Sequence, residues 1–81
     1  MKREKIFNMI EDALIKTEVV GIDISEELHL KNDIGLDSLD IVVFTMNLED
    51  DYNVFIEDEI EDKLQFMTVG EVVDYLEKKI K

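Results

Sequence analysis

The most regular stretch of the chain reads SLDIVVFTMNLEDDY and covers residues 38–52. At about 100° per residue, its apolar side chains fall into two stripes on nearly opposite sides of a helix. The stripe expected to face the core contains Ile41, Phe44, Leu48 and Tyr52. The other stripe contains Leu39, Val42, Val43 and Met46. It is expected either to pack against a further helix or to face a partner.

Helical spacing also appears on both sides of this stretch. From Arg3 to Lys16 the apolar positions are Ile6, Met9, Ile10, Ala13 and Leu14. A short helix is predicted from Asp58 to about Leu64, with Ile60 and Leu64 facing inward. Thr68 and Glu71 have the spacing of a capping box and predict a helix start. The stripe that follows contains Val69, Val72, Val73, Leu76 and Ile80.

Residues 17–36 show no sustained period, and a loop of that length is more often functional than not. Its recurring apolar residues are expected to lie against the core: Ile22, Ile24, Leu28, Leu30, Ile34 and Leu36. Residues 52–56 are β-rich but too isolated to form a sheet. We therefore predict an all-α single domain over residues 1–81. It is a small four-helix bundle of three longer helices and one short helix, with a long loop between the first two.

The composition excludes several classes of protein. The chain has 81 residues, 21 acids against 9 bases, and no cysteine, so a disulfide scaffold, a zinc-thiolate site and a cysteine nucleophile are excluded. A net charge of -12 argues against nucleic acid, against anionic membranes and against self-association, so we expect a monomer. No apolar run approaches the length of a membrane span, which predicts a cytoplasmic protein without membrane insertion.

The negative charge is concentrated in the middle of the chain. Residues 33–62 carry 11 acids and no Lys or Arg, whereas the flanks nearly balance. An ordinary acidic run is a solvated face. Because this run is long and interleaved with apolar residues, it favours a docking surface for basic partners.

The chain offers little for catalysis. His29 is its only histidine, and Ser38 with Asp37 or Asp40 lacks the G-x-S-x-G elbow of a hydrolase. Residues 51–55 begin like a calcium loop but lack its third oxygen ligand and its glycine. We expect neither an enzyme nor a specific metal site.

Ser38 itself stands out, because it follows the long loop and lies at the start of the strongest helix. The simple interpretation is an N-cap serine. A helix N-terminus also suits a phosphate ester on that hydroxyl, because it offers free N–H groups and the positive end of the dipole.

The stretch DIGLDSLD at residues 33–40 resembles the attachment motif of the acyl carrier proteins, whose core is Asp-Ser-Leu. The chain length, the helix pattern, the long first loop, the acidic second helix and the closing Asp74-Tyr75-Leu76 extend the resemblance over nearly the whole chain. In that family a phosphopantetheinyl transferase attaches the 4′-phosphopantetheine arm of coenzyme A to the serine. The arm carries acyl groups as thioesters between enzymes of fatty acid, polyketide or related biosynthesis.

The resemblance implies the site. Ser38 would be the attachment point, bordered by Asp37 and Leu39. Basic patches of acyl-transferring, condensing or ligase enzymes would dock on a surface containing Asp37, Leu39, Asp40, Val43, Met46, Glu49 and Asp50. The core stripe of the second helix would line the hollow that shelters an acyl chain in many members.

At two places the sequence departs from the usual pattern of this family, and both bear on which partner enzymes the chain would serve. Val43 replaces an acid common in fatty-acid-type carriers, and residues 55–58 differ from the usual segment before the short helix. Both suggest a specialised carrier. Two alternatives stay open at this point: an aminoacyl or peptidyl carrier with the same arm, and an unmodified acidic helical adaptor that binds a basic partner.

Overall fold

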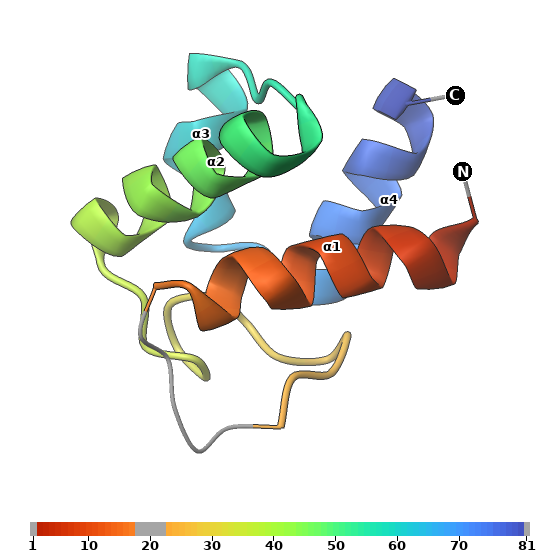
Figure 1. Cartoon of the computed structure of the whole chain (residues 1–81). Helices are drawn as coiled ribbons and strands as arrows, with labels where there is room; N and C mark the ends of the chain where they lie inside the picture. Colours follow the sequence, from red (N-terminus) through yellow and green to blue (C-terminus); the bar gives the residue numbers. More distant parts are fainter. Residues whose placement is uncertain (1, 18–22, 81) are drawn as a thin grey trace.

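The computed structural model describes residues 2–17 and 23–80. Within these ranges the chain forms α1 (Arg3–Ile15), α2 (Ser38–Tyr52), α3 (Asp58–Leu64) and α4 (Val69–Ile80). α1 packs against both α2 and α4, and the short α3 lies beside α2 (Figure 1). The described ranges contain no strand, only an isolated bridge between His29 and Thr68. The predicted all-α fold of three longer helices and one short helix is confirmed, with boundaries within a residue of those expected.

The core is built from the apolar stripes of the helices. α1 contributes all five of its predicted residues: Ile6, Met9, Ile10, Ala13 and Leu14. α4 contributes Val69, Val72, Val73 and Leu76. Phe44 of α2 is the largest side chain that is fully buried. No polar or charged side chain is buried in the described ranges, so the fold depends on apolar burial.

The predicted placement of Tyr52 on the core face is wrong. Its side chain is 38% exposed, and its hydroxyl donates a hydrogen bond of 2.9 Å to the Asp12 carboxylate of α1. Tyr52 lies on the same side of α2 as the core residues, but it lies in the last turn of the helix. Leu48 is the last residue of α2 that is buried in the core. Asn53 then ends the helix in the left-handed conformation, with φ 57°, as is common for Asn at this position.

The loop between α1 and α2 lies against the core, as predicted. Leu30, Ile34 and Leu36 are buried, and the partly buried Ile24 and Leu28 pack against the core. Ile22 lies outside the described residues.

Backbone hydrogen bonds fix this loop to the segment between α3 and α4. The Leu30 N–H donates to the Met67 carbonyl at 3.0 Å, and the Val69 N–H donates to the Leu28 carbonyl at 2.8 Å. Gly70 approaches the loop so closely that a Cβ there would lie 3.1 Å from the Glu26 carbonyl oxygen. The predicted capping box of Thr68 and Glu71 is confirmed by reciprocal bonds of 3.1 and 2.9 Å.

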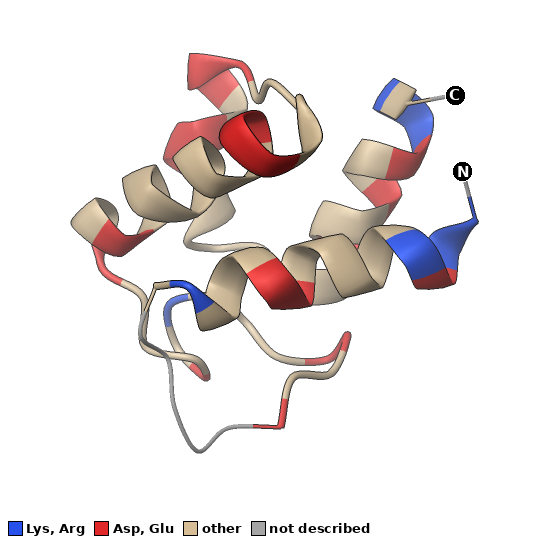
Figure 2. Cartoon of the chain, in the orientation of Figure 1, with Lys and Arg blue, Asp and Glu red and all other residues tan. Residues whose placement is uncertain are grey.

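Ion pairs join the helices around the core. Arg3 at the start of α1 pairs with Glu26 of the loop and with Asp74 of α4. Lys16, just after α1, pairs with Asp51 of α2. Figure 2 shows that acidic residues gather on the last turns of α2 and on α3, whereas basic residues lie mainly at the outer ends of α1 and α4. Among the described residues, every helix falls short of the length and apolar content that a membrane span requires.

We expect added salt to stabilise the fold, because ions screen the repulsion among the acids of α2 and α3. Raising NaCl from about 10 mM to about 500 mM should raise the melting temperature, by about 4–8 °C for each kcal/mol of repulsion removed. The double variant Asp50→Asn, Glu59→Gln should respond less than the control Asp23→Asn, Glu27→Gln, which neutralises exposed acids outside this region. Equal responses of the two variants would contradict the explanation.

A second prediction concerns Glu57, in the segment between α2 and α3. Hydrogen bonds from Lys79, at 2.5 Å, and from the Tyr75 hydroxyl lower the pKa of Glu57 to about 2. The folded pKa of Glu57 lies below the unfolded value of about 4.3. The stability that these hydrogen bonds give the folded state is therefore complete above about pH 4.3 and is lost as the pH falls toward 2. Glu57→Gln should therefore lower the melting temperature at pH 7 and flatten its decline below pH 5.

Thermal melts between pH 7 and pH 2 check this prediction. Glu59→Gln serves as the control, since it changes an exposed acid of the same region that makes no such bonds to any described residue. A wild-type decline below pH 5 that Glu57→Gln leaves unchanged would show that the contact with α4 contributes nothing.

Candidate functional site

Asp37, and not Ser38, is the N-cap of α2, so the predicted N-cap role of Ser38 is wrong. The Asp40 N–H donates to the Asp37 carboxylate at 2.8 Å, and the Asp37 N–H donates to the Asp40 carboxylate at 3.2 Å. This capping box satisfies two backbone donors reciprocally. Ser38 is consequently the first residue of the helix, and its side chain is not needed to cap it.

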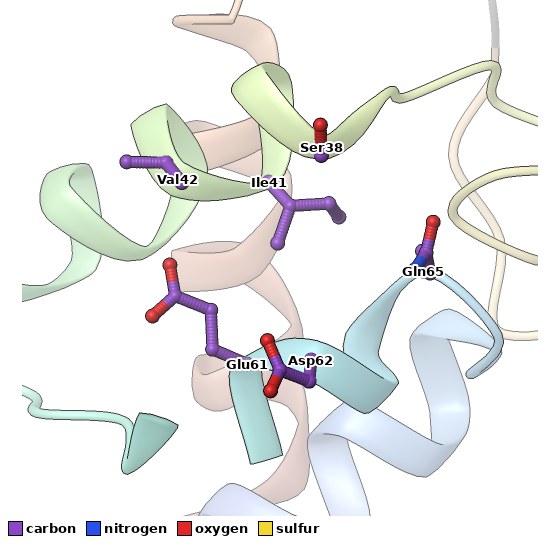
Figure 3. A pocket seen from close by; sticks show the side chains of 6 residues that line it. All are labelled: Ser38, Ile41, Val42, Glu61, Asp62 and Gln65. Carbon is purple, nitrogen blue, oxygen red and sulfur yellow. The ribbon is translucent and has the colours of Figure 1, made fainter. Parts of the chain in front are cut away.

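The Ser38 hydroxyl is accessible. Ser38 is exposed, and no hydrogen bond found among the described residues involves its hydroxyl. In Figure 3 the Ser38 oxygen points away from α3. The hydroxyl also lies at the positive end of a helix of 15 residues, which favours an attached phosphate.

The end of the loop between α1 and α2 positions this serine. The Leu36 N–H donates to the Leu30 carbonyl at 2.9 Å, and both side chains are buried. Between Ile34 and Leu36, Gly35 has φ +90°, a conformation that favours glycine. The turn at Gly35 lets the chain pass from the buried Ile34 and Leu36 directly to the exposed Asp37 and Ser38.

The second apolar stripe of α2 is largely exposed. Leu39 is 69%, Met46 is 53% and Val42 is 42% exposed, whereas Val43 is half-buried and lines a cavity with Lys16 and Thr17. Glu49 and Asp50 lie exposed at the C-terminal end of the same face. Leu39 and Met46, in the middle of this stripe, are therefore exposed and not packed by a further helix in the described part of the chain.

Val42 is more exposed on this surface than Val43, although only Val43 was included in the docking set expected from the sequence. The helical spacing of the stripe already placed Val42 on this face. Val42 lies about 100° from Ile41, on the side of α3, whereas Val43 turns toward the end of α1. We use the name α2 surface below for Leu39, Val42, Met46, Glu49 and Asp50.

A cavity of about 120 Å³ opens beside Ser38, between α2 and α3. Its α2 wall contains Ile41 and Val42, and its opposite wall contains Glu61, Asp62 and Gln65 (Figure 3). Of the core stripe that was expected to line a hollow, Ile41 lines this cavity, whereas Phe44, Leu48 and Tyr52 do not. The three polar residues were missed, because nothing in their local pattern places them near Ser38.

The remaining candidates lie apart from this site. The His29 ring nitrogen lies 3.2 Å from the Asp33 carboxylate, which also accepts a bond of 2.7 Å from the His29 N–H. These hydrogen bonds lower the pKa of Asp33. No hydrogen bond of the described residues joins His29 to Ser38. Residues 2–17 and 23–80 contain no cluster of three metal-ligating side chains.

Comparisons with known proteins agree with this geometry. The family model described as "Phosphopantetheine attachment site" matches residues 8–76, a range that includes Ser38. An acyl carrier protein of an Exiguobacterium strain is 41% identical, over 99% of this chain and 100% of the relative. Those of Thermotoga maritima and Lactobacillus johnsonii are 37% and 40% identical, over 96% and 94% of this chain and 95% and 94% of the relatives.

The resemblance noted in the sequence is therefore confirmed over nearly the full length of the chain. The residues around Ser38 fit the prosthetic group of this family, because they combine an unbonded hydroxyl, a helix N-terminus for the phosphate and an adjacent cavity. The chain belongs to the acyl carrier proteins, which carry acyl groups on a covalently attached 4′-phosphopantetheine arm.

Proposed function

We propose that Ser38 is the residue that receives the arm, within a single carrier domain over residues 1–81. The single observation that carries this proposal is the capping box of Asp37 and Asp40, which leaves the hydroxyl of the first helical residue exposed and unbonded. Ser25 is the only other serine of the chain, and it lies in the loop with no helix N-terminus behind it.

The modification is a phosphoryl transfer. A bond forms between Ser38 Oγ and the phosphorus next to pantetheine, and the pyrophosphate bond of coenzyme A breaks. The hydroxyl proton leaves to a base of the transferase, and adenosine 3′,5′-bisphosphate is released. When attached, the arm supplies a thiol that holds acyl groups as thioesters, which this cysteine-free chain lacks. The chain itself acts as a carrier and not as a catalyst.

The α2 surface is the proposed docking site for the transferase and for the enzymes that load and unload the carrier. Its exposed Leu39 and Met46 offer apolar contacts beside Ser38, and its acids offer charge to basic patches. Asp37, Asp40 and Val43 border this surface; Asp40 is partly covered and committed to the capping box. Charge attraction raises the association rate more than the affinity, which suits a carrier that must leave each enzyme quickly.

The partner set includes acyl-transferring, condensing or ligase enzymes. The relatives reported above are all acyl carrier proteins, which favours acyl over peptidyl transfer. An unmodified adaptor would not need an accessible serine at the head of α2. A cytoplasmic location, a monomeric state and a specialised pathway stay predictions from the sequence.

The first test of the proposal is intact mass spectrometry after incubation with coenzyme A, Mg²⁺ and a permissive phosphopantetheinyl transferase. We expect one phosphopantetheine adduct on the wild type and on the matched control Ser25→Ala, and none on Ser38→Ala, because the hydroxyl is the acceptor. Circular dichroism should show that Ser38→Ala keeps its helical content. An adduct on Ser38→Ala, or none on the wild type with several transferases, would refute the assignment.

The second test concerns docking. Reversing Glu49 and Asp50 to Lys should slow modification of Ser38 about tenfold at low salt, mainly through the association rate. The control Asp23→Lys, Glu27→Lys makes the same change in net charge on the loop and should slow it much less. Stopped-flow or initial-rate measurements at two ionic strengths separate the two variants. Equal rates for both variants would place the docking surface elsewhere.

A further inference from the structure

The two walls of the cavity beside Ser38 differ in chemistry. Ile41 and Val42 of α2 make one wall apolar, whereas Glu61, Asp62 and Gln65 make the facing wall polar. Figure 3 shows Ile41 pointing toward α3 and the Glu61 carboxylate pointing back toward α2. A group that enters this cavity therefore meets carboxylate oxygens as well as methyl groups.

Glu61 is held at this wall by a neighbour on α2. The single proton of the Thr45 hydroxyl has two acceptors within reach, the Glu61 carboxylate at 3.2 Å and the Val42 carbonyl at 2.9 Å. No ion pair in the described part of the chain involves Glu61 or Asp62, and Lys and Arg are absent from residues 33–62. Glu61 thus keeps acceptor capacity in a cavity with no cation of its own.

The cavity is also small. Its volume of about 120 Å³ is below the roughly 150 Å³ of an apolar cavity that holds one benzene molecule. A long alkyl chain would need the core to open, and it would remove the carboxylate from water without offering it a hydrogen bond. A short group that ends in a donor would instead satisfy Glu61, most strongly if the donor is an ammonium.

We propose that this cavity makes the carrier selective for short acyl groups that end in a hydrogen-bond donor, with Glu61 as the specificity-determining residue. The inference rests on the proposed attachment of the arm to Ser38, because the flexible arm then lets its acyl end fold back into a cavity next to its own anchor. An unbranched alkyl group stays outside, on the surface.

Three acyl groups with the same number of non-hydrogen atoms test this inference: butyryl, 3-hydroxypropionyl and β-alanyl, with decanoyl for length. Each is loaded onto Ser38 from its coenzyme A thioester, and loading is verified by intact mass. Two-dimensional NMR then compares the methyl signals of Ile41 and Val42 with those of the carrier bearing the free thiol. We expect the largest shifts for β-alanyl, smaller shifts for 3-hydroxypropionyl, and little change for butyryl and decanoyl.

Two variants isolate the role of Glu61. Glu61→Leu should abolish the shifts caused by β-alanyl and allow butyryl to shift the same methyl signals. Thr45→Val, which keeps Glu61 but removes the hydroxyl beside it, should weaken the β-alanyl shifts without reversing the order. Glu59→Leu is the matched control, because Glu59 is an exposed acid of the same helix that does not line the cavity.

The rate at which hydroxylamine cleaves the thioester gives an independent measure of how far the cavity shields the acyl group from solvent. The β-alanyl thioester should be cleaved roughly three- to tenfold more slowly on the wild type than on Glu61→Leu, a ratio within the strength of one charge-assisted hydrogen bond. The butyryl thioester should not show this protection by the wild type.

The inference is overturned if butyryl or decanoyl shifts the cavity signals of the wild type as much as β-alanyl does. It is also overturned if no acyl group shifts them, or if Glu61→Leu and Glu59→Leu behave alike. These failures are distinct from failure of the proposed function, in which no adduct forms on Ser38 at all.

Discussion

The rotation of α2 about its own axis determines which of its side chains face the core, the neighbouring helices and the solvent. Ile41, Phe44 and Leu48 are buried in the core and fix this rotation. Because each residue turns the helix by about 100°, every other side chain of α2 then has a determined direction. Because no polar side chain is buried among the described residues, apolar packing in this core is the main means of orienting the helix.

The two flanks of α2 face different neighbours as a consequence. On one flank Asn47 donates to the Ala13 carbonyl of α1 at 3.2 Å, and Asp51 pairs with Lys16. On the other flank Thr45 bonds Glu61 of α3, and Ser38 borders the cavity. The outward face, with Leu39 and Met46, is exposed in the described part of the chain. Exposed apolar side chains that lie together on one helix face are typical of a surface that meets partners.

Electrostatics divides the molecule in a similar way. The ion pairs of Arg3, Lys16 and Lys79 use acids that link helices and loops around the core. Glu49, Asp50 and Glu59 have no such partner in the described ranges. Their mutual repulsion costs stability, which the apolar core offsets. In return, these acids stay available to a basic partner.

The sequence by itself determined the helices, the core and the candidate serine, because periodicity, capping patterns and the motif at residues 33–40 are local signals. The family assignment, confirmed by the comparisons, followed from the same residues. Only the tertiary structure decided which residue caps α2. Ser38 and Asp37 are both good N-caps, and the choice depends on how the buried Leu36 and the turn at Gly35 deliver the chain to the helix. It also showed that Tyr52 lies past the end of the core and that Glu61 and Ser38 line the same cavity. Both depend on where helices distant in sequence meet, and the spacing of residues within one helix contains no information about that meeting.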